Sequence, residues 1–172
     1  MPAARRPETA ATDVLVAVAP QLTRWIERLL AGHDPPLTLA QYLALRAIWR
    51  GAESGSEIAR RAGVSGPAVS QLLATLTDAG LIVRAAAAAD RRRHTLTVSG
   101  DGAAVLRSAE ALLRRRLSAL LADVPPHEVA ALARLLGAVE ASLDGRPPPR
   151  RPRPPKSPRA SRGPTSPPGR RR

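Results

Sequence analysis

Hydrophobic residues recur at helical spacing through most of this chain. Over residues 10–31 they fall three and four positions apart, which predicts an amphipathic helix that Pro20 kinks or restarts. The same periodicity predicts helices over 38–50 and about 99–121, and a last helix that begins at the proline pair 125–126. We therefore expect a mainly α framework in which helices pack through one apolar face.

Polar residues mark where several of these helices begin. Thr38-Leu-Ala-Gln41 and Ser54-Gly-Ser-Glu57 both have the order of a capping box, and Leu37 with Tyr42 has the spacing of a hydrophobic staple. Ser99 is placed to cap the helix that follows it. These signals predict defined helix starts.

Two short helices are expected to meet at Gly63. The first covers Ser56–Ala62, and the second runs from Gly66 to about Ala79 with Ser65 as its cap. Small residues at the crossing, a glycine that permits a left-handed corner and apolar residues that seat the second helix are the pattern of a helix-turn-helix. The alternative is an ordinary helical corner, since such corners recur in unrelated folds.

The outer face of the second helix is the candidate DNA-reading surface. In a helix-turn-helix this face enters the major groove, where Ser, Thr and Gln suit hydrogen bonds to phosphates and base edges. The candidate residues are Ser65, Gly66, Pro67, Ala68, Ser70, Gln71 and Thr75.

Two short strands are expected at 81–84 and 94–98, joined by a loop too long for a tight hairpin. A hairpin behind a helix-turn-helix is a wing, and arginine at its tip suits the narrow, electronegative minor groove. Asp90 is placed to orient a neighbouring guanidinium group. The alternative is a solvated charge run. The candidate wing residues are Asp90, Arg91, Arg92 and Arg93.

Charge is concentrated at the C-terminus. The 172 residues include 27 basic and 14 acidic ones, a net charge of +13. Residues 145–172 hold ten of the basic residues and ten of the 18 prolines, so we expect a disordered Arg/Pro-rich tail. The expected organisation is a flexible N-terminus at 1–10, a winged helix and dimerisation domain at 11–144, and this tail.

Composition also excludes several function classes. The chain has no cysteine, and His33, His94 and His127 lie far apart in sequence, so we expect no disulfide, metal site or cofactor. No nucleophile motif or phosphate-binding loop is present, which argues against an enzyme. No apolar run approaches the ~18 residues of a membrane span, so a cytoplasmic, DNA-associated protein is expected.

Taken in order, these segments resemble the MarR family of bacterial winged-helix transcription regulators. The resemblance covers roughly residues 12–143, and the spacing from Gly80 to Asp90 matches the wing of the family. The segments that carry it are Leu37-Thr-Leu-Ala-Gln-Tyr-Leu-Ala-Leu-Arg46, residues 56–73, Gly80-Leu-Ile-Val-Arg84, Asp90-Arg-Arg92 and Leu96-Thr-Val-Ser99.

The resemblance implies a winged helix-turn-helix with a two-stranded β-hairpin wing and N- and C-terminal dimerisation helices. It also implies a homodimer, repression relieved by a small-molecule effector, and an Asp-x-Arg pair at Asp90 and Arg92. Two segments depart from the family. Gly66 stands where many members carry a basic or polar residue, and Ala85–Ala89 where they carry proline and acidic residues. These departures shift weight from base readout to wing and backbone contacts.

Apolar faces at both ends of the folded region predict a two-fold dimer. It would set two recognition helices about one DNA turn, ~34 Å, apart on an inverted-repeat operator. Completion of a single core by both helices is the alternative. The resemblance places an effector pocket near the junction of the dimer helices with the DNA-binding lobe, where Trp25, Tyr42 and Trp49 are candidate lining residues. Tyr42 and Trp49 are seven apart and share a helix face, and core packing is the favoured alternative for them.

The leading interpretation is a dimeric, sequence-specific DNA-binding repressor released by a small-molecule effector. A second interpretation is a protein-interaction scaffold whose tail offers proline-rich segments such as Pro149–Pro152. A third is a nonspecific nucleic-acid binder in which the basic tail dominates and the folded part only dimerises.

Overall fold

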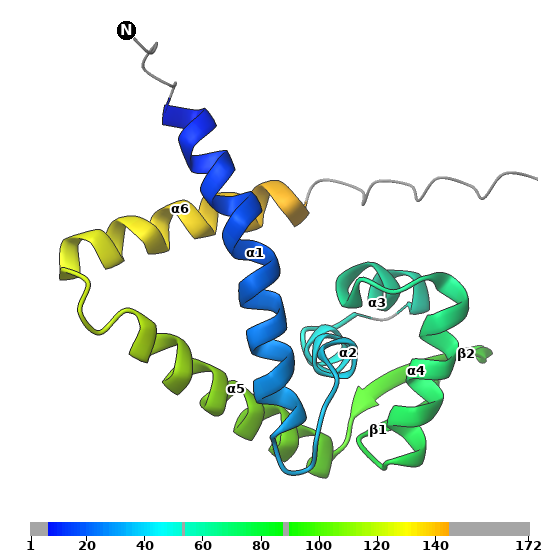
Figure 1. The fold of residues 1–172 in the computed structure, drawn as a ribbon. Coiled ribbons are helices and arrows are strands. Elements are labelled where there is room, and N and C mark those ends of the chain that lie inside the picture. Colours follow the sequence, from blue (N-terminus) through cyan, green and yellow to red (C-terminus); the bar gives the residue numbers. More distant parts are fainter. Residues whose placement is uncertain (1–6, 53, 88–89, 145–172) are drawn as a thin grey trace, which may run out of the picture.

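The chain forms six helices and one two-stranded antiparallel sheet in the part that the structure describes. This computed structural model describes residues 7–52, 54–87 and 90–144. In chain order the elements are α1 (Pro7–Ala31), α2 (Leu39–Trp49), α3 (Gly55–Ala62), α4 (Gly66–Asp78), β1 (Ile82–Ala87), β2 (Asp90–Val98), α5 (Gly100–Leu120) and α6 (Pro126–Asp144) (Figure 1). The predicted mainly α fold with a hairpin wing is confirmed.

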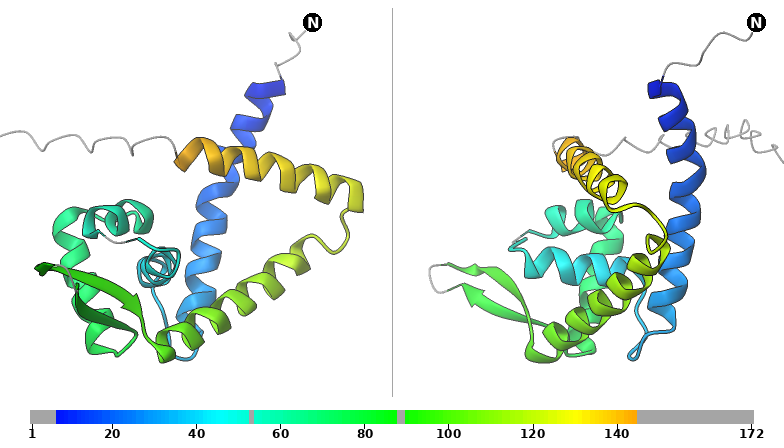
Figure 2. Two further views of the ribbon diagram at one scale, coloured as in Figure 1. Left: turned by 180° about the vertical axis from the view of Figure 1, so that it is seen from behind. Right: turned by 90° about the vertical axis from the view of Figure 1, so that its left-hand side faces the viewer.

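Two parts of the molecule differ in how they pack. Helices α2, α3 and α4 and the β1–β2 hairpin lie together in what we call the winged lobe, residues 39–98. Helix α5 leads away from this lobe, and α6 turns back from its far end (Figures 1 and 2). The fold therefore places the helix-turn-helix and its wing on one side of the molecule, with α5 and α6 extending beyond them.

A single aliphatic core joins the winged lobe to the end of α1 and the first half of α5. The largest side chains with no more than 1% exposure come from five different elements, and they are Leu30, Leu45, Ile58, Leu76 and Ile82. Leu106, Ala109 and Leu113 add one face of α5 to the same cluster. Removing this apolar surface from water is the main source of stability in such a fold.

Side-chain capping hydrogen bonds form at three of the four predicted helix starts, namely Thr38, Ser54 and Ser99, and not at Ser65. Both bonds of the capping box at Thr38 are present: Gln41 N donates to Thr38 Oγ1 at 3.1 Å, and Thr38 N donates to Gln41 Oε1 at 2.8 Å. At Ser54 only half of the predicted capping box forms: the hydroxyl accepts from Glu57 N at 3.2 Å, while the Glu57 carboxylate pairs with Arg61 Nη2 at 2.7 Å instead. Ser99 caps α5 as predicted, because its hydroxyl accepts from Gly102 N at 2.9 Å.

Helix α1 begins at Pro7 and continues through Pro20 as one element, so Pro20 does not start a new helix. Proline removes one intrahelical hydrogen bond. Residues 11–20 are all exposed, so water can satisfy the carbonyl group that loses its donor. Residues 1–6 of the predicted flexible N-terminus lie outside the described residues.

The wing differs from the prediction in the length of its strands. β1 and β2 pair antiparallel from Ile82–Val98 out to Ala87–Asp90, with an irregularity between Ala86 and Ala87. The predicted long loop was therefore wrong. Its alanines and successive arginines carry no alternating pattern, and the antiparallel ladder extends regardless, because each further pair satisfies backbone groups. Residues 88–89, and the tail at 145–172, lie outside the described residues.

Candidate nucleic-acid interface

The corner between α3 and α4 has helix-turn-helix geometry. Gly63 follows α3 with φ 69° and ψ 24°, a left-handed conformation that glycine adopts without steric cost. Ile58 and Ala62 of α3 are buried, as are Val69 and Leu73 of α4, and all four belong to one core cluster. The two helices are therefore held at a defined angle, as the sequence pattern predicted.

Helix α4 divides cleanly into a buried face and an exposed face. Its buried residues are Val69, Leu73 and Leu76. Every residue predicted to read DNA is exposed, namely Ser65, Gly66, Pro67, Ala68, Ser70, Gln71 and Thr75. All seven lie on α4 or at its start, and α4 stands at the edge of the winged lobe (Figure 1).

Ser65 lies at the N-cap of α4 with extended backbone angles, but its side chain makes no capping hydrogen bond. The expected Ser65 cap is thus present in position only. Pro67 has no N–H to donate, and Val69 N makes the first helical bond, to Ser65 O at 3.0 Å. Among the described residues, the amides of Gly66 and Ala68 and the Ser65 hydroxyl have no hydrogen-bond partner, so they are available to an external acceptor. A helix start of this kind suits a phosphate oxygen.

The four candidate wing residues lie in strand β2 rather than in a loop. Asp90 begins the strand, and Arg91, Arg92 and Arg93 follow it toward His94, whose partner is Ala86. The hairpin projects away from the helices in Figure 2. The side chains of these residues lie outside the described part of the structure, so only their backbone position at the outer end of the wing is established.

The three aromatic residues occupy three different environments. Tyr42 is buried in the core, Trp25 is half-buried, and Trp49 at the end of α2 is 58% exposed. Core packing therefore accounts for Tyr42 but not for Trp49, although the two are seven positions apart. Burial raises the pKa of the Tyr42 phenol, nearby Arg46 opposes this rise, and Glu110 adds to it.

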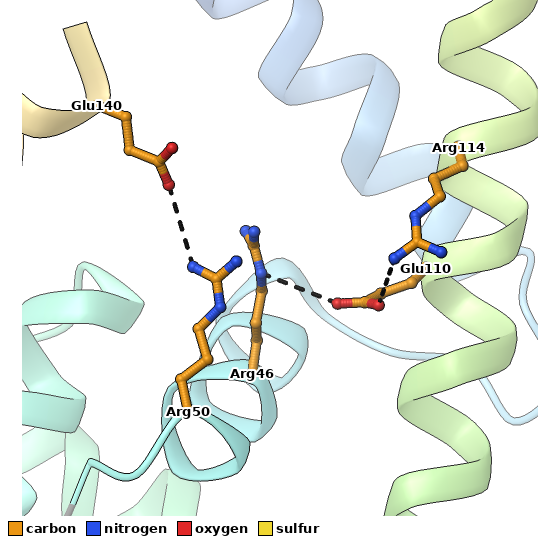
Figure 3. A network of polar contacts seen from close by, with 5 residues as sticks. All are labelled: Arg46, Arg50, Glu110, Arg114 and Glu140. Atoms are coloured by element: carbon orange, nitrogen blue, oxygen red, sulfur yellow. Dashed lines mark hydrogen bonds and ion pairs between the residues drawn. The ribbon is translucent and has the colours of Figure 1, made fainter. Parts of the chain in front are cut away.

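A set of charged residues that sequence analysis did not single out links α2 to α5 and α6 (Figure 3). Glu110 accepts from Arg114 Nη2 at 3.1 Å and lies 3.9 Å from Arg46 Nε, and Arg50 lies 4.0 Å from Glu140. Arg46 Nε is shielded from solvent and has no hydrogen-bond partner in the described ranges. Only the Glu110–Arg114 spacing is visible in the sequence, because the other contacts depend on tertiary packing.

Of the three histidines, His33 has a clear structural role, and the side chain of His94 lies outside the described part of the structure. The His33 ring nitrogens lie 2.8 Å from Pro35 O and 2.9 Å from Ser108 Oγ, so this side chain ties the α1–α2 loop to α5. Within the described ranges there is no group of three or more His, Asp or Glu side chains that fits a metal ion. No helix in those ranges combines the length and the apolar character of a membrane span.

Comparisons with known proteins agree with this geometry. The MarR family profile matches residues 36–93. The HTH-type transcriptional repressor Rv2887 of Mycobacterium tuberculosis is 31% identical over 101 residues, which cover 58% of this chain and 73% of that protein. The Mycobacterium bovis repressor Mb2911 matches to the same extent.

Solved structures share the fold. The crystal structure of Rv2887 in complex with p-aminosalicylic acid aligns with TM-score 0.64 and 26% identity over 75% of this chain and 97% of that one. Rv1404 of M. tuberculosis aligns with TM-score 0.68 and 23% identity over 86% of this chain and all of that one. With the helix-turn-helix, the wing and these relatives in agreement, the chain belongs to the MarR family of DNA-binding transcriptional regulators, which are not enzymes.

Proposed function

We propose that this protein is a homodimeric, sequence-specific repressor that binds an inverted-repeat operator and is released by a small-molecule effector. The observation that carries the proposal is the division of α4, whose apolar face is buried while the whole predicted reading face is exposed. The uncapped start of α4 adds backbone donors for phosphate.

The two ends of α4 carry different side chains and have different proposed roles in DNA binding. Gly66 and Ala68 carry no long side chain, so the duplex backbone can approach the start of the helix closely. Gln71 is the longest polar side chain on the exposed face and would reach base edges, where an amide suits adenine. Thr75 Oγ1 donates to Gln71 O at 3.0 Å and keeps its acceptor capacity.

Selection from a random-sequence duplex pool tests the DNA-binding proposal. We expect the wild-type protein to enrich an inverted repeat, with affinity falling ~10³–10⁵-fold between 50 and 200 mM salt if six to ten phosphates are neutralised. Failure to enrich any sequence, or an affinity nearly independent of salt, would contradict the proposal.

The wing would contribute through its arginines. Asp90, Arg91, Arg92 and Arg93 stand at the outer end of β2, where a minor groove beside the major-groove helix would be in reach. We expect Arg92→Ala to weaken operator binding about 10-fold or more. Arg134→Ala, at an exposed position of α6, is the matched control and should bind as the wild type does. Equal affinities for the two variants would refute the wing assignment.

Dimerisation is supported by apolar residues that the single chain leaves uncovered. They lie at the N-terminal half of α1 and along α6, and no described side chain of α6 is buried. The exposed large residues are Val14, Leu15, Val16, Val18 and Leu22 of α1 and Leu132, Leu135, Leu136, Val139 and Leu143 of α6. Surfaces of this extent rarely stay in water, and a second copy covers both at once. Sedimentation of a stable monomer at micromolar concentration would remove this part of the proposal.

For the effector we propose an aromatic carboxylate at the junction of α2 with α5. A relative was crystallised with p-aminosalicylic acid and with salicylic acid. In the described part of this chain Arg46 Nε–H makes no hydrogen bond, although it lies 3.9 Å from Glu110 Oε1, and it lies near Tyr42. Trp25 and Trp49 retain exposed surface. Salicylate titration should quench tryptophan fluorescence and release DNA over the same concentration range. Release without any fluorescence change would place the effector elsewhere.

A further inference from the structure

Helix α4, both wing strands and α5 meet at a small hydrogen-bonded junction. We call Gly80, Leu81, Val98, Ser99 and Gly102 the wing-base joint. The Ser99 hydroxyl donates to Gly80 O at 2.6 Å and accepts from Gly102 N at 2.9 Å, and Ser99 N donates to Leu81 O at 3.0 Å. One serine thus ties the segment that ends α4 to the segment that begins α5.

Gly102 allows this approach because it has no side chain. A Cβ there would overlap Leu81 O and lie 2.8 Å from the Leu81 carbonyl carbon and 2.9 Å from Val98 Cγ1, whereas ordinary van der Waals contact begins at 3.4 Å. The first two obstacles are backbone atoms, which cannot rotate away as a flexible side chain can. Any larger residue must therefore move α5 relative to β1.

The α4 side of the joint is equally constrained. Gly80 N donates to Thr77 O and Leu81 N to Leu76 O, each at 2.9 Å, so the joint continues directly into the last turn of α4. The neighbouring core residues Leu76 and Ile82 are buried, and Ile82 pairs with Val98 across the sheet. The recognition helix, the base of the wing and the start of α5 therefore form one rigid unit.

We propose that Ser99 and Gly102 are positioning residues for DNA binding: they fix the direction of the recognition helix and the wing relative to α5. Neither needs to touch DNA. In the proposed dimer, α5 connects the winged lobe to α6, so the angle at this joint sets the separation of the two reading surfaces. The effect on affinity rests on the proposed function, but the effect on geometry does not.

The geometric effect can be measured without DNA. The chain contains no cysteine, so spin labels can be attached at Ala74→Cys on α4 and Ala111→Cys on α5, both exposed positions. Pulsed electron resonance should show a displaced or broadened distance distribution after Gly102→Ala. Gly100→Ala is the matched control, because a Cβ at Gly100 meets nothing within 4 Å. Superimposable distributions for Gly102→Ala and the wild type would overturn the proposal.

Variants of Ser99 test the same joint if Gly102→Ala does not fold. Aspartate is a good N-cap and can accept from Gly102 N, but its carboxylate cannot donate to Gly80 O. Threonine retains both bonds. We expect Ser99→Asp to displace the distance distribution and Ser99→Thr to restore the wild-type one. If the two variants gave the same distribution, the tie to Gly80 would have no positioning role.

The consequence for DNA is tested with unlabelled full-length protein and a duplex that the wild type has enriched from a random pool. Loss of one or two base or phosphate contacts predicts about 10- to 100-fold weaker binding for Gly102→Ala and Ser99→Asp. Gly100→Ala and Ser99→Thr should stay within about twofold of the wild type. Weakened binding without a displaced distance distribution would overturn the positioning role. A wild type that enriches no duplex would refute the proposed function and leave the distance measurement valid.

Discussion

Helices α4 and α6 both have amphipathic sequences, but only α4 buries its apolar face within the chain. The apolar face of α4 packs into the core of the winged lobe and leaves a polar face outside. The apolar residues of α6 stay exposed, with Leu135 at 66% and Leu143 at 64%. One chain therefore supplies a core that covers the apolar face of α4 but not the apolar face of α6. We infer that the lobe is stable through the core that it shares with α1 and α5 of the same chain and that α6 depends on a second copy.

The largest expected effect is on the core of the winged lobe. Leu76→Ala removes a fully buried side chain under α4. We expect the free energy of unfolding to fall by about 2–5 kcal/mol, because the substitution leaves a cavity in a close-packed region. Urea denaturation measures it, with Val83→Ala, at a 48% exposed position, as the control. Equal losses in the two variants would mean that burial of Leu76 in this core does not stabilise the fold.

The next effect concerns the outer helices. Leu135→Glu would place a charge in the proposed dimer interface, where its desolvation costs several kcal/mol, so we expect the dimer to weaken about 100-fold or more. Ala141→Glu, on the opposite side of α6 from Leu132 and Val139, is the control and should leave the dimer intact. Sedimentation equilibrium separates the two outcomes, and a Leu135→Glu dimer as tight as the wild type would contradict the assignment.

A smaller effect is expected on the exposed face of α4. Gln71→Ala should cost about 1–3 kcal/mol of operator affinity and relax specificity at one base pair of each half-site. Arg134→Ala, at an exposed position of α6 on the side opposite Leu132 and Val139, is again the control. Binding competition against single-base operator variants measures both. Unchanged specificity would leave Gln71 without a reading role.

Truncation after Asp144 should change specificity more than affinity for the operator. It removes ten basic residues, so nonspecific binding to a scrambled duplex should fall while operator binding persists. Filter binding to both duplexes at several salt concentrations measures the difference. Loss of operator binding together with nonspecific binding would favour the interpretation in which the basic tail dominates.

The smallest effect is expected at the ion pair that links α2 to α6. Arg50 and Glu140 are 4.0 Å apart and both mostly exposed, at 53% and 68%. Arg50→Ala should therefore lower the free energy of unfolding by less than about 0.5 kcal/mol. If urea denaturation shows a loss of more than about 1 kcal/mol in the free energy of unfolding, contacts within the single chain stabilise α6 more than its exposed apolar face suggests.

Most local features were predictable from the sequence. The Thr38 box, the left-handed Gly63 corner and the start of α5 at Ser99 formed as predicted, since each depends on residues within four positions of one another. The inner part of the wing strands was predicted, but their extension to Ala87 and Asp90 was not, because Ala85–Ala87 carry no strand pattern. Core packing was the favoured interpretation for Trp49, but its side chain is exposed while Tyr42 on the same helix face is buried. Helical spacing identifies a face but does not show where along that face the core ends.

The sequence by itself determined the helix-turn-helix, the exposed face of its second helix and the apolar character of α6, because caps, glycine corners and helical periodicity act over a few residues. Only the tertiary structure decided that Ser99 meets Gly80, that Gly102 leaves room for the Leu81 carbonyl and that Arg46 faces Glu110. These contacts join segments far apart in the chain. Their geometry follows from how the whole core packs, which no local pattern records.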